Sequence, residues 1–254
     1  MAPHLKTATP YSTADSSWRE FDMAFQAAVN TNTMRVFAYQ ATFRGPGGEK
    51  PADFARMIPD AERPTFDLKC RLAAISQAIK GGIMGMDVRL ATRVLTDFID
   101  NPVEDAERMQ RIVRRLEFPA DKLVLEFSEL DDLESEKMTT LVHAYQQRGF
   151  TVAFNDFGSA NDGLSLLNGF TPDTIKLPAD LVHRLDQSWL SRMVVENIVA
   201  ITEQKRIKLI AEGVDSRAEF DRLRQLGVPL MRGDYLAPAQ IGMLSPFDPD
   251  QIAA

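Results

Sequence analysis

Short apolar runs typical of β-strands alternate with longer stretches typical of α-helices along most of this sequence. The short runs are rich in Val, Ile, Leu and Phe, whereas apolar residues in the longer stretches recur at helical spacing. Repetition of this βα alternation about eight times predicts an α/β protein with a TIM-like (β/α)8 barrel. A doubly wound open sheet is the main structural alternative. The strand-like runs lie at residues 21–29, 35–43, 85–90, 122–129, 150–157, 173–177, 207–214 and 229–236.

One domain accounts for nearly the whole chain. Its 254 residues, of which 44% are hydrophobic, are enough to bury one large core, and α/β barrels of this length fold as one domain. Residues 1–16 are polar, contain two prolines and lack periodicity, so we expect a disordered lead-in there. The barrel domain is expected over residues 17–254, opening at a segment, 17–20, that resembles a helix capping box.

The charge and the cysteine content exclude several classes of function. A formal net charge of −7 argues against a nucleic-acid partner, because phosphate binding requires a concentrated positive face. The single cysteine, Cys70, excludes an intramolecular disulfide framework and a cysteine-rich zinc site, and it fits a reducing compartment. No stretch approaches the roughly 20 apolar residues of a membrane span. We therefore expect a soluble, cytoplasmic protein that binds neither nucleic acid nor membrane.

Polar or charged residues stand at the end of nearly every strand-like run. The carboxyl ends of parallel barrel strands converge on one mouth, where active sites form, so these side chains should meet in space. A mixture of carboxylates, carboxamides and a lysine is typical of the remains of a metal and general-base site. The alternative is that each is a solvated strand end. The residues concerned are Gln40, Arg89, Glu126, Asn155, Asp156, Lys176, Glu212 and Arg232.

Ordered motifs from about Phe21 to Pro238 resemble those of the EAL-domain cyclic di-GMP phosphodiesterases. The segment YQATFRGPGG at 39–48 resembles the family signature YEALVRGPGG, and FQAAV at 25–29 resembles the strand FQPIV. Further matches are EFSE at 126–129 with E-x-T-E, NDFG at 155–158 with DDFG, Lys176 with the lysine of K-x-D, AEGVD at 211–215 with AEGVE, and RGDY at 232–235 with QGY.

This resemblance implies a barrel that holds two divalent cations, usually Mg²⁺ or Mn²⁺. In the family, the cations activate a water that attacks one phosphodiester of cyclic di-GMP. The resemblance implies a vestigial catalytic set of Glu126, Asp156, Lys176 and Glu212, a retained ligand-binding set of Gln26, Arg44 and Asp215, and a loop-supporting role for Glu129. The alternatives are that Arg44 pairs with a carboxylate of a neighbouring loop and that Glu129 is an ordinary acid at a helix N-terminus.

Several substitutions fall on residues that the family uses. Gln40 replaces the glutamate of EAL, Asn155 replaces the first aspartate of DDFG, and Arg89 replaces the metal-binding asparagine after the third strand. Pro178 and Arg232 replace ligand-binding residues. Loss of one outer-shell partner already costs about 10- to 100-fold in metal affinity or activity, so we expect the Mg/Mn pair to be lost. Arg89 and Arg232 are expected to point inward and pair with the remaining carboxylates.

The first functional hypothesis is a catalytically inactive EAL-like domain that regulates an unknown protein partner in cyclic di-GMP-type signalling. The second is a metal-independent cyclic di-GMP receptor, in which Arg44, with Arg89 or Arg232, holds the phosphates. The third is a weak phosphodiesterase. The resemblance also implies a homodimer formed through residues 159–167.

Overall fold

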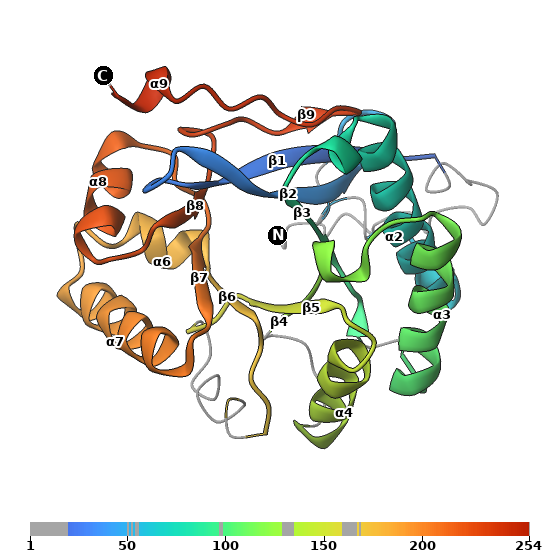
Figure 1. Ribbon diagram of the computed structural model, residues 1–254. Coiled ribbons are helices and arrows are strands. Elements are labelled where there is room, and N and C mark those ends of the chain that lie inside the picture. Colours follow the sequence, from blue (N-terminus) through green and yellow to red (C-terminus); the bar gives the residue numbers. More distant parts are fainter. Residues whose placement is uncertain are drawn as a thin grey trace, which may run out of the picture.

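Eight strands close into a barrel in the computed structural model of this chain (Figure 1). The strands are β1 (Asp22–Asn30), β2 (Arg35–Arg44), β3 (Arg89–Arg93), β4 (Leu123–Ser128), β5 (Thr151–Asn155), β6 (Thr174–Leu177), β7 (Lys208–Ala211), β8 (Leu230–Arg232) and a short β9 (Gln240–Ile241). From β2 to β8 the strands are parallel neighbours in chain order. β1 closes the ring by pairing antiparallel with both β2 and β8, and β9 pairs with the first half of β1. The closed ring confirms the predicted barrel and excludes the open sheet.

The structure describes residues 20–49, 51, 53, 56–96, 99–128, 135–158, 167 and 169–253. Several sequence-based expectations fall outside this range, namely the lead-in at 1–16, most of the capping-box segment 17–20, Glu129, and all but the last residue of the segment 159–167. Within the described part of the chain, no helix is both long enough and apolar enough to cross a membrane.

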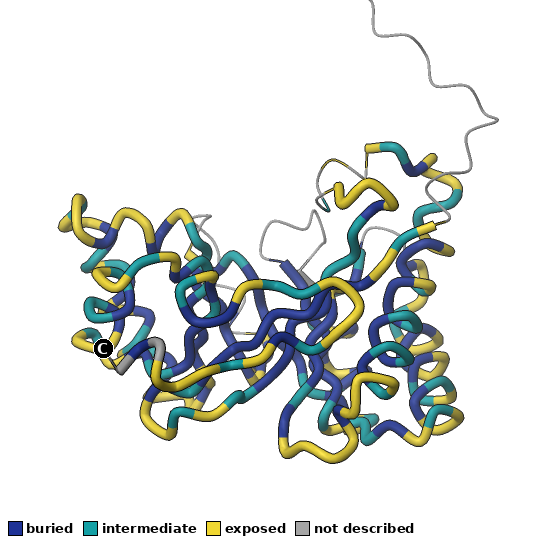
Figure 2. The backbone as a smooth tube through the Cα atoms, turned by 90° about the horizontal axis from the view of Figure 1, so that it is seen from above, coloured by how far each residue is buried: buried dark blue, intermediate teal, exposed yellow. Residues whose placement is uncertain are grey.

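Helices surround the barrel and cover its outer face (Figure 1). They are η2 (Asp60–Glu62), α2 (Arg63–Lys80), η3 (Ile83–Gly85), α3 (Pro102–Arg115), η5 (Ala120–Lys122), α4 (Ser135–Gln146), α6 (Ala179–His183), α7 (Trp189–Lys205), α8 (Arg217–Gln225) and α9 (Asp250–Ala253). Strand residues such as Phe25, Leu125 and Phe154 are buried in the core. Each side chain of this size contributes about 1.5–3 kcal/mol when fully buried. Figure 2 shows the buried strands through the middle of the molecule, with exposed residues on the surrounding helices and loops.

The first βα unit of the predicted barrel is a hairpin instead. Only residues 31–34 separate β1 from β2, and Met34 in this turn has a positive φ of 54°. A connection between parallel strands needs about a dozen residues or more, so a linker this short joins antiparallel strands. The sequence predicted both strands correctly, but their relative direction depends on the turn.

The third strand lies later in the sequence than the predicted run at 85–90. Gly85 ends η3, and β3 begins at Arg89 and ends at Arg93. Val88 and Leu90 are both buried, as is Val94 beyond the strand, so apolar pattern alone gives no clear boundary here. The shift reverses the position of Arg89, which begins the strand rather than ending it.

Under the helices, a buried ionic cluster ties α2 to α3 and α4. Arg71 is 2% exposed, and its guanidinium lies 2.7 Å from Asp67 Oδ2 and 2.9 Å from Asp105 Oδ2. Arg71 also donates a hydrogen bond to the Tyr145 hydroxyl, which in turn donates to Asp105. Asp67 Oδ1 accepts a hydrogen bond from the backbone of Leu95, just after β3. The cluster therefore fixes three helices and one loop around a single cation.

Candidate functional site

Polar side chains from six strands, and one directly after a seventh, meet at the carboxyl end of the barrel. Below them the interior is filled by small or medium apolar residues, which include Ala91, Val124 and Ala153. Side chains two residues further along the parallel strands therefore form the next layer, at the mouth. The structure brings together at this level Gln26, Gln40, Glu126, Asn155, Lys176, Glu212 and Arg232.

Lys176 lies at the centre of this group. It is 3% exposed, and its ammonium forms an ion pair with Glu126 and donates a hydrogen bond to Gln40 Oε1. The same ammonium lies 3.0 Å from Glu212 Oε1. Among the described residues its carboxylate partners are Glu126 and Glu212.

Two amides flank Glu126 and bind the carboxylate oxygen that does not pair with Lys176. Glu126 is 1% exposed, and its Oε2 accepts hydrogen bonds from Gln40 Nε2 at 2.7 Å and from Asn155 Nδ2 at 3.3 Å. The amide of Gln40 is oriented by its neighbours, because a lysine can only donate and an ionised carboxylate can only accept. An acidic side chain at either amide position would place a second negative charge against Glu126.

Arg232 at the end of β8 provides a second, partly buried cation. Its Nη2 lies 2.9 Å from Glu212 Oε1, and its Nη1 donates to Gln26 Oε1 at 2.7 Å. Burial alone would raise the pKa of Glu212, but the charges of Arg232 and Lys176 lower it to about 2. Burial alone would lower the pKa of Arg232, but Glu212 raises it. Both groups are therefore charged at neutral pH.

Arg89 does not belong to this group, so the expectation that it points into the old metal site is wrong. It pairs in register with Ala38 at the opposite end of the barrel, and its guanidinium lies 4.9 Å from the centre of the Phe37 ring. The β3 residue that pairs in register with Glu126 is Arg93, which is exposed. Placing the third strand about four residues too early in the sequence caused the error.

Asp156 turns away from the central lysine. It adopts a positive φ of 60°, and its carboxylate accepts a hydrogen bond of 2.7 Å from Ser128 Oγ. The adjacent Asn155 is 9% exposed, and its Oδ1 has no hydrogen-bond partner among the described residues. Ser128 had no predicted role, although its place at the last position of a strand indicates that it reaches the mouth.

Arg44 and Asp215 lie at the rim. Arg44 ends β2 and donates to the carbonyl of Phe43 at 3.0 Å. No ion pair joins it to a loop carboxylate in the described part of the chain. Burial lowers the pKa of Arg44, and the positive charge of Arg232 lowers it further, whereas the negative charge of Asp234 raises it. Asp215 accepts a hydrogen bond from the backbone of Asp234 at 3.1 Å.

The rim also contains two residues that the sequence had not predicted there, Asp234 and His183. Asp234 Oδ1 accepts a hydrogen bond of 2.8 Å from Gln26 Nε2. His183 Nε2 lies 3.4 Å from Asp215 Oδ2 and 2.9 Å from the carbonyl of Gly213. Pro178 follows β6 directly and precedes α6, as its position in the sequence suggested.

A family model described as the EAL domain matches residues 13–239. Two similar proteins of Escherichia coli K12 are the probable cyclic di-GMP phosphodiesterase PdeN and the blue light- and temperature-regulated antirepressor BluF. PdeN is 24% identical, and the match covers 86% of this chain and 43% of PdeN. BluF is 23% identical, and the match covers 90% of this chain and 59% of BluF. The chain thus spans about half the length of these curated relatives.

Solved structures resemble the whole barrel. One is the c-di-GMP-bound form of a standalone versatile EAL protein from Vibrio cholerae O395, at 30% identity and a TM-score of 0.84, covering 92% of this chain and 98% of that one. Another is the manganese/cy-diGMP complex of Klebsiella pneumoniae BlrP1 at pH 6, at 26% identity and a TM-score of 0.82, covering 95% and 60%. The similarity therefore extends over both the sequence and the fold.

Proposed function

Because the chain belongs to the EAL domain family, we propose that it is a catalytically inactive member that regulates a protein partner in cyclic di-GMP signalling. One observation carries the proposal. The inner carboxylates Glu126 and Glu212 are already paired with two side-chain cations, Lys176 and Arg232. Two negative and two positive charges leave this inner group of four side chains electrically balanced.

The donor set does not fit a pair of divalent cations. Mg²⁺ and Mn²⁺ prefer several oxygen ligands with a net negative charge, and Mg²⁺ demands near-octahedral geometry. Of the candidate ligands here, Gln40 turns its Oε1 to Lys176, and Glu126 accepts from two amides. Among the described residues, no group of three His, Cys, Asp or Glu side chains is arranged to hold a metal ion. Asn155 Oδ1 is a buried oxygen open to a water or a ligand, but one amide oxygen does not hold a metal pair.

The direct test is hydrolysis. Purified protein at high concentration is incubated with cyclic di-GMP and either Mn²⁺, Mg²⁺ or EDTA, and the linear dinucleotide is quantified. We expect no release above the protein-free control in any of the three. Product that depends on Mn²⁺ would establish a weak phosphodiesterase, the third hypothesis, and would overturn the proposal.

A protein partner is supported by one relative's name and by one surface. BluF is named an antirepressor rather than a phosphodiesterase. In this chain, the first five residues of α7 include Trp189, Leu190 and Met193, which are 67%, 52% and 40% exposed. Clustered exposed apolar residues mark interaction sites, and Trp is enriched where binding energy concentrates. This surface is the place where we expect the partner to bind.

A second candidate function is a cyclic di-GMP receptor that needs no metal, and Arg44 favours it. Its guanidinium forms no ion pair with a carboxylate in the described chain, although the charges of Arg232 and Asp234 both act on it, and a guanidinium is a good ligand for a phosphodiester. Calorimetric titration with EDTA and then with excess Mg²⁺, on the unaltered protein and on Arg44→Ala, distinguishes the two functions. Binding below about 10 μM, or −7 kcal/mol, that survives EDTA and disappears in Arg44→Ala would establish the receptor. Absence of heat in every arm would leave the protein-partner function standing.

A further inference from the structure

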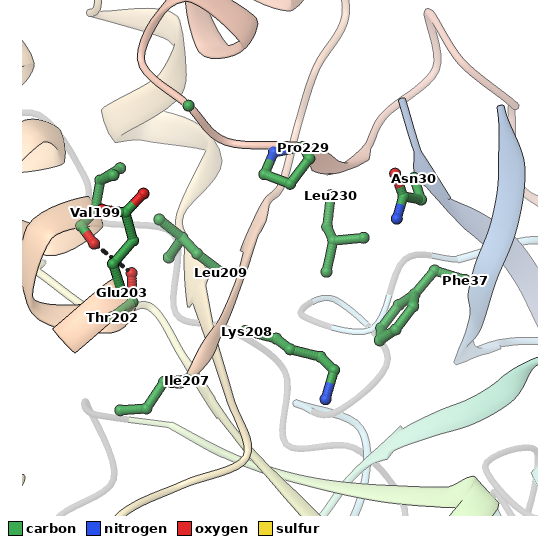
Figure 3. Close-up of a pocket in the computed structure, with 11 residues that line it drawn as sticks. Asn30, Phe37, Val199, Thr202, Glu203, Ile207, Lys208, Leu209, Pro229 and Leu230 are labelled. Atoms are coloured by element: carbon green, nitrogen blue, oxygen red, sulfur yellow. Dashed lines mark hydrogen bonds between the residues drawn. The ribbon is translucent and has the colours of Figure 1, made fainter. Parts of the chain in front are cut away.

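A second pocket lies at the amino-terminal end of the barrel, opposite the polar mouth. Its volume is about 360 Å³, within the range of about 300–1,000 Å³ that is usual for small-molecule sites. The walls come from the first residues of β7 and β8, Lys208 and Leu230, from the last residue of β1, Asn30, and from the C-terminal half of α7 (Figure 3). None of these residues takes part in the mouth described above, so this pocket is a separate site.

Phe37 forms the boundary between this pocket and the barrel interior. In the β1–β2 hairpin Val29 pairs with Val36 and Ala28 pairs with Ala38, which leaves Phe37 as the extra residue of a β-bulge. A bulge re-aims the side chain that it contains. The Phe37 ring accordingly lines both the lower pocket and the narrow space under Gln40 and Lys176.

Lys208 gives the pocket a positive charge. It pairs in register with Thr174, whose side chain lines the barrel interior, so Lys208 lies on the inward face of β7. Figure 3 shows its side chain extending toward Phe37. In the described part of the chain the Lys208 ammonium has neither an ion pair nor a hydrogen bond. Arg89, whose guanidinium lies over the Phe37 ring at 4.9 Å, adds a second positive charge at this end.

The remaining walls are mainly apolar. Ile207, Leu209 and Leu230 are buried residues that line the pocket. The one acidic residue among those lining it is Glu203, which is exposed and lies on α7 across the pocket from Lys208 (Figure 3). No ion pair links the two within the described residues, so Glu203 does not neutralise Lys208.

From these features we propose that the lower pocket binds a small monocarboxylate with an apolar or aromatic body. The carboxylate would receive a charge-assisted hydrogen bond from Lys208, which is stronger than a bond between neutral groups. The apolar body would cover Leu209 and Leu230 and meet the Phe37 ring, and it would displace water from apolar surface. This ligand is distinct from cyclic di-GMP, and its site stands whichever function the mouth has.

Sodium benzoate is a suitable probe, and benzamide is its uncharged counterpart of the same shape. Amide chemical shifts of the ¹⁵N-labelled full chain are followed while each compound is titrated to millimolar concentration. We expect saturable shifts at Leu209, Gly227 and Leu230 with benzoate. Benzamide should bind roughly 5- to 10-fold more weakly, the equivalent of about one charge-assisted hydrogen bond.

Two variants complete the test. Lys208→Met keeps the aliphatic stem and should reduce benzoate affinity by the same roughly 5- to 10-fold factor, while benzamide affinity stays unchanged. Lys80→Met, at an exposed lysine that does not line the pocket, should leave both affinities unaltered. The unliganded spectrum of each variant reports whether it is folded. Unsaturable shifts, equal affinity for the two compounds, or an unchanged benzoate affinity in a folded Lys208→Met would overturn the proposal.

Discussion

Glu212 and Arg232 face each other across the ends of β7 and β8, with Glu212 Oε1 2.9 Å from Arg232 Nη2. The same oxygen lies 3.0 Å from Lys176 Nζ, so one carboxylate atom joins two cations from different strands. Removal of one member of such a set leaves the others charged and partly desolvated. This relationship sets the direction of the first two predictions.

Arg232→Gln should lower the free energy of unfolding at pH 7 by about 1–3 kcal/mol, because Glu212 loses one of its two cations in a partly buried site. Urea unfolding monitored by circular dichroism measures the difference. The matched control is Arg217→Gln, which breaks an exposed ion pair with Asp221 and should cost much less than Arg232→Gln. Equal losses in the two variants would show that the mouth of the barrel is no better shielded from solvent than α8.

The stability of the fold should depend on pH through Glu212. Its pKa in the folded protein is about 2, below its ordinary value of 4.5, so its contribution is complete above pH 4.5 and is lost as the pH falls toward 2. That contribution is about 3–4 kcal/mol, since the two pKa values differ by about 2.5 and one pKa unit corresponds to about 1.4 kcal/mol.

Unfolding free energies of the unaltered protein and of Glu212→Gln, measured between pH 5 and pH 2, check this expectation. The variant is less stable at pH 5, and the difference between the two proteins should shrink as the pH falls through this interval. A difference that stays constant would mean that Glu212 keeps its ordinary pKa.

Replacing the amides of Gln40 and Asn155 by carboxylates should restore metal binding. In EDTA, the double variant Gln40→Glu with Asn155→Asp should lose about 1–3 kcal/mol of stability, because two new carboxylates stand against Glu126. Added Mn²⁺ should raise its melting temperature, since a cation then relieves the repulsion.

Thermal unfolding with and without Mn²⁺ makes the measurement. The control is the double variant Asn197→Asp with Gln225→Glu, which makes the same change of charge on exposed helical surface. Its melting temperature should not respond to Mn²⁺. A melting temperature that rises with Mn²⁺ in the unaltered protein would contradict the expected loss of the metal pair.

Arg71→Met should destabilise the fold by about 3–5 kcal/mol, because Asp67 and Asp105 would remain buried without their cation. The control Arg63→Met removes a more exposed pair with Asp60 and should cost less than about 1 kcal/mol. Chemical unfolding of both variants at pH 7 provides the comparison. A small loss in Arg71→Met would mean that the two aspartates bind protons once the arginine is gone.

Much of the fold was predictable from local patterns. Apolar runs located the strands, because alternation along a strand and spacing along a helix are properties of a few consecutive residues. Because the carboxyl ends of parallel barrel strands converge, the sequence also predicted that Glu126, Lys176 and Arg232 would meet, although about 50 residues separate each from the next along the sequence. The motifs around these residues indicated the family, because each motif is also a run of a few consecutive residues.

The tertiary structure decided the register of the strands and everything that follows from it. Arg89 and Arg93 are both arginines in one short strand, and only pairing with β2 and β4 shows that Arg93, not Arg89, lies beside Glu126. The hairpin bulge that aims Phe37 at the lower pocket depends likewise on contacts between strands. A shift of a few residues moves a side chain from one end of the barrel to the other, and pairing between distant segments, rather than local propensity, determines that shift.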